Sequence, residues 1–236
     1  MRIAFNIPRI SQVKQIIEQT FEPLIVEFSM QFQLSLEEDR KRFAIFTSRE
    51  DHCLLELLWR QRSGEIAADV ASIISNHQDH LQIAQQMGVD FHHISVTPGT
   101  KQSAERAQLE LIANQVDFIV LARYMQILSP QVIERFPHRI INIHHSFLPA
   151  FVGAKPYERA FDRGVKIIGA TAHYATEELD AGPIIEQDVL RIDHGYSVKE
   201  MKAAGRQIER TVLARAVRWH VEDRILVHQN KTVIFT

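Results

Sequence analysis

The residues best suited to chemistry in this chain lie in one short stretch, Asn142-Ile143-His144. A carboxamide carries fixed N–H donors that can hold a developing oxyanion, and an imidazole can move a proton near neutral pH. The apolar residues before Asn142 predict a buried strand that ends here, and residues two apart on a strand point to the same side. We therefore expect Asn142 and His144 to face one cleft. A solvated polar strand end is the alternative for this pair taken alone.

Three motifs follow one another along the chain. The stretch from Asn142 to Pro149, Asn-Ile-His-His-Ser-Phe-Leu-Pro, is preceded by Leu121–Pro130 and followed by Thr176–Pro183. Together, over roughly residues 42 to 235, they resemble the formyltransferase fold family, and within it the hydrolases called formyltetrahydrofolate deformylases. The resemblance implies hydrolysis of 10-formyltetrahydrofolate to tetrahydrofolate and formate. It also implies formate supply for purine synthesis, a balanced one-carbon folate pool, and no cofactor.

The resemblance places the catalytic residues of the family on Asn142, His144 and Asp180. In formamide hydrolysis, water attacks a carbonyl, an oxyanion is held and a nitrogen leaves. Asn142 can donate to the oxyanion, and His144 can carry the proton. A carboxylate at Asp180 would stabilise the imidazolium and orient the water. Taken alone, Asp180 before Ala-Gly-Pro also suits an ordinary turn.

The folate site follows from the same resemblance. The pterin ring is expected in an apolar slot at Met125, Gln126, Ile127 and Leu128, where backbone N–H and C=O groups contact it. The apolar members of this stretch also have a simpler interpretation as core residues. The resemblance extends the substrate-binding set to five further residues, which are His145, Gly153, Ala175, Thr176 and Glu178.

The loop after the first catalytic-domain strand separates hydrolysis from formyl transfer. Transformylases that use a ribonucleotide carry glycines here to bind its phosphate, whereas Thr47–Cys53 has no glycine and includes Glu50 and Asp51. The transferases also usually have proline where this chain has His145. Water is therefore the expected acceptor. Folate-dependent formyl transfer to an amine remains an alternative, as does a non-enzymatic module that senses folate or an amino acid.

The histidines and the single cysteine do not require a metal. A metal site needs three convergent ligands, and the spacing of His52, His173 and His194 demands none. Cys53 is the only cysteine, which excludes an intrachain disulfide and a cysteine-rich zinc site. We predict no metal, and we interpret Cys53 as a small buried residue.

Composition is that of an ordinary globular protein. The chain has 236 residues, 45% hydrophobic and 24% charged, with a formal net charge of −2. This balance gives no electrostatic case for nucleic acid or for a basic membrane anchor. No apolar run has the length of a membrane span, and the first residues do not resemble a signal peptide, so the cytoplasm is the default compartment.

Alternating strand and helix patterns from Phe43 onward predict an α/β domain over residues 41–236. We expect an open, mostly parallel twisted sheet with helices on both faces, formyltransferase-like and of Rossmann type. A capping box at Ser197 and Glu200 predicts the start of a long helix, which Gly205 could interrupt. The predicted strands are 43–46, 70–76, 91–96, 118–121, 139–142, 165–174, 184–192, 225–227 and 232–235. The other predicted helices are 53–59, 81–87, 101–114 and 130–136.

Residues 1–40 predict a smaller unit. Ile3–Ile7 and Met30–Leu34 alternate as strands, and residues between them have helical spacing, which gives β-α-β. This resembles the second half of an ACT domain, so either the start is truncated or another chain supplies the missing surface. Two strands and one helix are marginal alone. We therefore expect a homo-oligomer.

Overall fold

The computed structural model of this chain describes residues 2–7, 12–150 and 155–235. The chain divides into two compact units, Met1–Arg40 and Lys41–Thr236. Among its described residues, the first unit contains one helix, α1 (Val13–Glu27). All remaining elements belong to the second unit.

A seven-stranded sheet forms the centre of the second unit, with the order β3-β2-β1-β4-β5-β6-β7. The five strands from β3 to β5 are parallel, and β6 and β7 are antiparallel to their neighbours. The strands are β1 (Lys41–Thr47), β2 (Ala68–Ser75), β3 (Phe91–His93), β4 (Phe118–Ala122), β5 (Ile140–His144), β6 (Ile167–Tyr174) and β7 (Ile184–Arg191).

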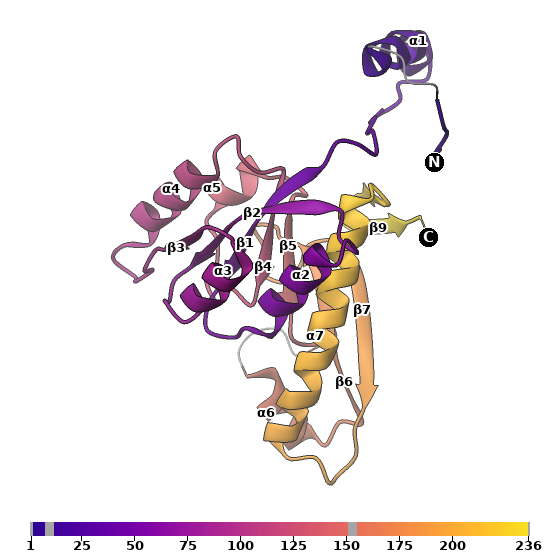
Figure 1. Cartoon of the computed structure of the whole chain (residues 1–236). Helices are drawn as coiled ribbons and strands as arrows, with labels where there is room; N and C mark the ends of the chain where they lie inside the picture. Colours follow the sequence, from indigo (N-terminus) through magenta and orange to yellow (C-terminus); the bar gives the residue numbers. More distant parts are fainter. Residues whose placement is uncertain (1, 8–11, 151–154, 236) are drawn as a thin grey trace. The chain divides into compact units, whose positions relative to one another are not determined.

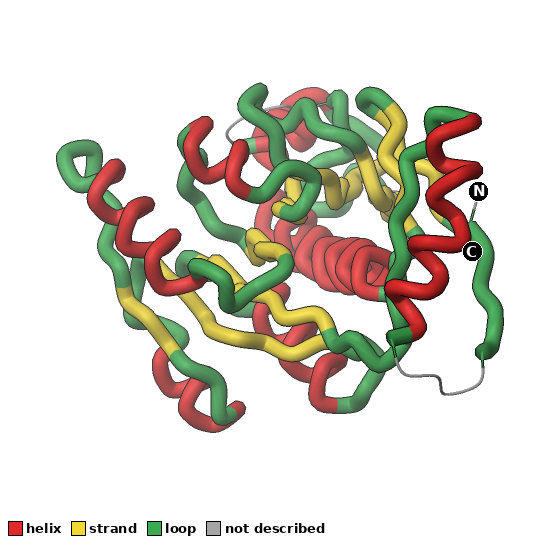
Figure 2. Tube along the Cα trace, turned by 90° about the horizontal axis from the view of Figure 1, so that it is seen from above, coloured by secondary structure: helices red, strands yellow, loops and turns green. Residues whose placement is uncertain are grey.

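Helices cover both faces of the sheet (Figure 2). Strand residues alternate between two cores: Phe43 and Ile45 belong to one, and Ala44 and Phe46 to the other. The first core is completed by α2 (His52–Arg62), α3 (Leu81–Met87) and α7 (Val198–Val221), and the second by α4 (Lys101–Ile112) and α5 (Pro130–Arg135). The predicted mostly parallel α/β sheet with helices on both faces is thereby confirmed.

Helix α7 is the longest helix among the described residues and runs beside β6 and β7 (Figure 1). The capping box predicted at its start is present, since the Ser197 side chain accepts from the Glu200 amide and the Glu200 carboxylate accepts from the Ser197 amide. Gly205 does not interrupt the helix, which was the open question from the sequence. The reason for glycine there is a close contact, described below.

Two features differ from the sequence-based expectation. Helix α6 (Pro156–Arg163) was not predicted, although proline in its first turn and Gly164 after its end are typical helix boundaries. The strands predicted at Ile3–Ile7 and Met30–Leu34 are wrong for the described chain, which assigns no strand to residues 2–7 or 12–40. Alternation gives a strand its faces, but a strand also needs a hydrogen-bonded neighbour, which a single helix cannot supply. Kinship of this unit to an ACT domain stays a prediction.

The chain closes with a hairpin. Strands β8 (Ile225–His228) and β9 (Lys231–Ile234) pair antiparallel around Gln229 and Asn230, as predicted. Within the described residues, no helix combines the length and apolar character that crossing a membrane requires.

Candidate active site

Two of the three predicted catalytic residues, Asn142 and His144, lie at the carboxyl end of β5, the edge at which open α/β sheets bind ligands. The third, Asp180, lies in the loop between β6 and β7. Asn142 and His144 are two residues apart on β5, so their side chains lie on the same side. Antiparallel pairing places Asn142 opposite His173 of β6 and His144 opposite Thr171. Two neighbouring strands therefore fix the positions of four polar side chains.

The structure brings His144 and Asp180 together. His144 Nδ1 lies 3.3 Å from Asp180 Oδ2, and both side chains are largely buried. His144 Nε2 is buried and has no hydrogen-bond partner among the described residues. A buried polar atom left unpaired is costly, so it marks a position that a substrate or water can complete.

His173 lies between Asn142 and Asp180, and it was not among the catalytic or substrate-binding residues predicted from the sequence. Its Nε2 lies 3.1 Å from Asn142 Nδ2 and 3.9 Å from Asp180 Oδ1, while its Nδ1 lies 3.0 Å from the carbonyl oxygen of Tyr174. Because that carbonyl can only accept, Nδ1 carries the proton and Nε2 accepts from the Asn142 amide. Asn142 keeps a second amide hydrogen for a ligand. Only the register between β5 and β6 could have identified His173, because it lies opposite Asn142 when these two strands pair.

The ionisation of Asp180 and His173 depends on burial and on neighbouring side chains. Burial raises the pKa of Asp180, but the hydrogen bond from His144 and the charges of His144 and His173 outweigh it and hold that pKa below its usual value. Burial lowers the pKa of His173, which favours its neutral form. Asp180 is therefore ionised, and His173 is a neutral imidazole that lies beside both Asp180 and Asn142.

The loop that carries Asp180 depends on close packing. Asp180 has a positive φ of 57°, a conformation in which aspartate is tolerated better than most residues. At Gly182, an added Cβ would lie 1.8 Å from the Tyr174 carbonyl oxygen, so a side chain there would displace the loop. Glycine at this position therefore allows the loop to fold onto β6.

The predicted folate-binding stretch follows β4 directly. Met125 and Ile127 are 57% and 60% exposed, which disfavours their interpretation as core and leaves them available to a ligand. Leu128 packs against the second core instead. The Met125 amide donates to Ser48 Oγ, which donates in turn to Asn76 Oδ1, so the start of this stretch is anchored to the loop after β1.

The remaining predicted substrate-binding residues lie in two groups. Ala175 and Thr176 follow β6 and are partly buried, and Glu178 is exposed in the Asp180 loop. His145 follows His144, with 5.3 Å between their ring centroids. Gly153 lies outside the described residues.

One cluster of possible metal ligands occurs in the described chain. Single ligand atoms of His52, Cys53 and Glu209 all lie within 4.8 Å of one another. Burial raises the pKa of the Cys53 thiol, and Arg123 Nε lies 3.5 Å from the Glu209 carboxylate. A cation bound here would lie beside a guanidinium, so the electrostatics favour a protein ion-pair network over a metal site.

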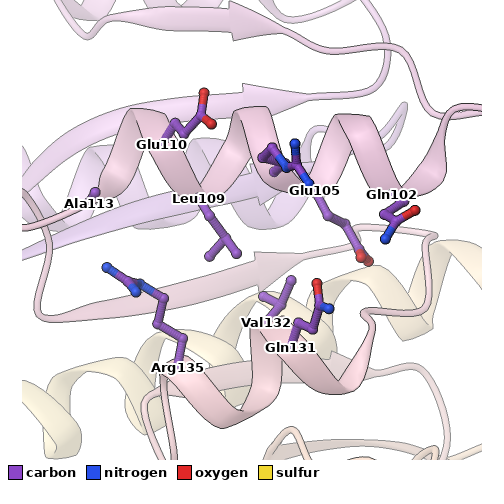
Figure 3. Close-up of a pocket in the computed structure, with 9 residues that line it drawn as sticks. Gln102, Glu105, Leu109, Glu110, Ala113, Gln131, Val132 and Arg135 are labelled. Carbon is purple, nitrogen blue, oxygen red and sulfur yellow. The ribbon is translucent and has the colours of Figure 1, made fainter.

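A cavity of about 240 Å³ lies between α4 and α5, and its lining shares no residue with the predicted site or with the cluster of His52, Cys53 and Glu209. Figure 3 shows its lining, which is contributed by side chains of these two helices, including Glu105, Glu110 and Arg135. Charged side chains of both signs line it, and none of the predicted site residues does so. The chemistry of the site therefore does not lie in this cavity.

As a whole, the site combines an amide donor, an imidazole with a buried, unpartnered nitrogen, and a carboxylate. These groups can stabilise an oxyanion, transfer a proton and orient a nucleophile around one carbonyl carbon. An exposed apolar stretch lies at the carboxyl end of the adjacent β4. This arrangement suits a flat heterocycle that carries an acyl group.

Both the sequence and the fold of this chain are similar to those of known proteins. The formyl transferase family matches residues 41–217. The chain is 49% identical over 236 residues to the formyltetrahydrofolate deformylase of Bacillus subtilis (strain 168), spanning 100% of this chain and 79% of that protein. It is 44% identical over 196 residues to the protein of the same name from Escherichia coli (strain K12), spanning 83% and 70%.

Solved structures agree. A crystal structure of a formyltetrahydrofolate deformylase from Pseudomonas syringae pv. tomato str. DC3000 superposes with a TM-score of 0.92 at 50% identity, covering 94% of this chain and 75% of that one. The glycinamide ribonucleotide transformylase 1 of Symbiobacterium toebii gives a TM-score of 0.80 at 30% identity, covering 87% and 99%.

Proposed function

This chain belongs to the formyl transferase family, and on that premise we propose that it hydrolyses 10-formyltetrahydrofolate to tetrahydrofolate and formate. The observation that carries the proposal is the His144–Asp180 pair, 3.3 Å apart, at the strand end that also carries Asn142. Two proteins named for this activity are each 49% identical to this chain over alignments that span 100% and 99% of it.

The reaction balances with water as the only co-substrate. The water oxygen forms a bond to the formyl carbon, and the bond from that carbon to N10 of the folate breaks. N10 leaves with a proton, and formate carries away the water oxygen. Since every atom comes from water or the folate, the proposal requires no cofactor.

Each polar side chain has one role in this scheme. Asn142 donates its free amide hydrogen to the oxyanion, and one such donor is typically worth ~10²–10³ in rate. His144 presents Nε2 to the reacting atoms and transfers the proton between water and N10, while Asp180 holds Nδ1 and stabilises the imidazolium. His173 is a positioning residue, because it contacts Asn142 and Asp180 rather than the substrate.

Folate binding is assigned to the surfaces beside these groups. The exposed side chains of Met125 and Ile127, with the backbone from Gln126 to Leu128, form one wall for the pterin ring. Ala175, Thr176 and Glu178 form the opposite wall, and His145 and Gly153 complete the proposed set. Folate is the proposed partner, and a second copy of this chain is the proposed assembly partner.

Formyl transfer to a phosphorylated amine is the competing function. A phosphate site needs several backbone N–H groups converging on one point, and the loop after β1 has no glycine to permit that approach. Glu50 and Asp51 in this loop are exposed and would lie beside the phosphate. At ~5 Å in a surface-like dielectric, each would oppose it by on the order of a few kcal/mol before screening.

The decisive experiment supplies 10-formyltetrahydrofolate together with glycinamide ribonucleotide and quantifies both products. The proposal predicts steady formate release and no formylated nucleotide. Formylated nucleotide that forms faster than free formate would assign the chain to the transferases instead.

A further inference from the structure

The sheet has a topological switch point between β1 and β4, where the proposed folate site occupies the stretch that follows β4. The side of this crevice next to the start of α2 has no role in the proposed mechanism. In the order β3-β2-β1-β4-β5-β6-β7, the chain builds outward in one direction from β1 and in the other from β4. Open α/β sheets bind ligands in the crevice beyond the carboxyl ends of such a strand pair. The segments that follow the carboxyl ends of β1 and β4 carry His52, at the start of α2, and Arg123, directly after β4.

A buried carboxylate from α7 joins these two segments. Glu209 is 1% exposed, and its Oε2 lies 2.7 Å from His52 Nε2 and 3.5 Å from Arg123 Nε. Its Oε1 accepts a hydrogen bond of 3.0 Å from the Tyr157 hydroxyl of α6. Four segments far apart in the sequence therefore meet at one carboxylate. We call these residues, His52, Arg123, Tyr157 and Glu209, the Glu209 cluster.

Gly205 provides a separate sign that this arrangement is specific. An added Cβ at Gly205 would lie 1.8 Å from the Tyr157 hydroxyl oxygen, so that hydroxyl rests directly on the α7 backbone. Gly205 and Glu209 are four residues apart and share a face of the helix. Glycine here costs helix stability relative to alanine, but it lets Tyr157 reach the carboxylate.

The cluster closes the crevice to solvent. His52 and Tyr157 are 8% and 5% exposed, and the Arg123 side chain is 13% exposed. Burial would raise the pKa of Glu209, but His52 and Arg123 outweigh it and hold that pKa at about 2, so the carboxylate remains ionised and paired. This side of the crevice is instead occupied by three side chains that pair with Glu209: His52 and Tyr157 through hydrogen bonds, and Arg123 through an ion pair. His52 Nδ1 and Arg123 Nε are buried without a hydrogen-bond partner among the described residues.

The cluster borders the catalytic residues. The ring centroid of His145 lies 5.3 Å from that of His144 and 6.0 Å from that of Tyr157. Arg123 also belongs to the segment that continues into the exposed Met125 and Ile127. A second substrate approaching the formyl carbon along β1 and β4 would meet the Glu209 cluster.

We propose that the Glu209 cluster is a specificity determinant that fills the second-substrate side of the crevice with paired side chains, so that water, and not an amine, reaches the formyl carbon. This inference rests on the proposed hydrolysis and names what selects the acceptor. The residues of the cluster do not contact the reacting atoms, so they act by occupying the space that an amine would need. Removing its volume admits an amine nitrogen to the place where water attacks.

The test measures how the formyl group divides between water and glycinamide, a compact amine. In the transfer, a bond forms from the amine nitrogen to the formyl carbon, the bond to N10 breaks, and one amine proton ends on N10. Tyr157→Ala removes the ring beside His145, and Gly205→Ala displaces that ring while keeping every charge. Each variant is expected to raise the ratio of N-formylglycinamide to formate by at least about tenfold over the unmodified protein, the discrimination that a small change in pocket volume typically supplies.

Matched controls separate this effect from general damage. Phe161→Ala truncates an exposed aromatic residue on the same helix as Tyr157, and Gly99→Ala adds a methyl group in open space. Both are expected to keep the original ratio. An unchanged ratio in either Tyr157→Ala or Gly205→Ala, folded by circular dichroism, would overturn the proposal.

A measurement on the unmodified protein tests the same point without any variant. Glycinamide is expected not to inhibit formate release, because the crevice offers it no site. Competitive inhibition would overturn the role of the cluster while leaving hydrolysis intact. An unmodified protein that releases no formate without an amine would instead contradict the proposed function.

Discussion

Three residues carry the proposed chemistry, and truncating any of them removes a different group. Asn142→Ala, His144→Ala and Asp180→Ala are each expected to lower kcat by ~10²-fold or more, as loss of an oxyanion donor or of a general acid/base does. KM for the folate should change much less, because its ring contacts other segments. Steady-state kinetics with His194→Ala, an exposed histidine outside the site, as control checks this. Near-normal kcat in His144→Ala would remove His144 from the mechanism.

His220 is one of the histidines that make stability depend on pH. Burial lowers the pKa of His220 to about 3 from an ordinary 6.5, with the charge of Lys41 contributing. Below the ordinary value the unfolded chain binds a proton that the folded chain does not, so stability falls as pH falls between these two values.

We therefore expect His220→Gln to reduce this pH dependence. Between about pH 7 and about pH 5, its free energy of unfolding should fall by about 2 kcal/mol less than that of the unmodified protein. Urea denaturation at both pH values measures the difference. Parallel curves for the two proteins would show that His220 does not titrate in this way.

At the scale of elements, the turn after β6 determines where Asp180 lies. Gly182→Ala is expected to displace this loop, because its Cβ would lie 1.8 Å from the Tyr174 carbonyl oxygen. A shift of about 1 Å in a catalytic group can cost ~10²-fold in rate, so kcat should fall strongly. Kinetics and thermal unfolding of Gly182→Ala beside Gly99→Ala compare a crowded glycine with an open one. Equal kcat values for the two variants would contradict this role of the turn.

The elements also show which parts of the structure a sequence can predict. Periodicity located the strand ending at Asn142 and His144, because alternation and β-branched residues act locally. It gave no role to His173 or Glu209, since their partners lie on other elements and depend on strand register and helix packing. The strands predicted at Ile3–Ile7 and Met30–Leu34 were wrong because alternation alone does not make a strand: strand formation also requires hydrogen bonds to a neighbouring strand, and no strand is assigned to the described residues of this unit.

At the scale of the whole molecule, the first unit predicts self-association. It exposes large apolar side chains, including Val26 at 73%, Phe28 at 64% and Ile3 at 63%. Exposed apolar residues gathered in one small unit are typical of an interface, and a second copy of the same segment would cover them. Val26→Glu with Phe28→Glu should therefore lower the molar mass measured by light scattering at micromolar concentration, whereas Leu226→Glu in the closing hairpin should not. An unmodified protein that is monomeric there would contradict the expectation.

The central claim is that water attacks the formyl carbon, and isotopic labelling of the solvent tests it most directly. Turnover of 10-formyltetrahydrofolate in ¹⁸O-labelled water, with no amine present, is followed by mass spectrometry of the formate. The account predicts that each formate carries a single oxygen atom from the solvent, that one tetrahydrofolate appears per formate, and that His144→Ala suppresses both. Unlabelled formate, or no formate until an amine is added, would contradict it.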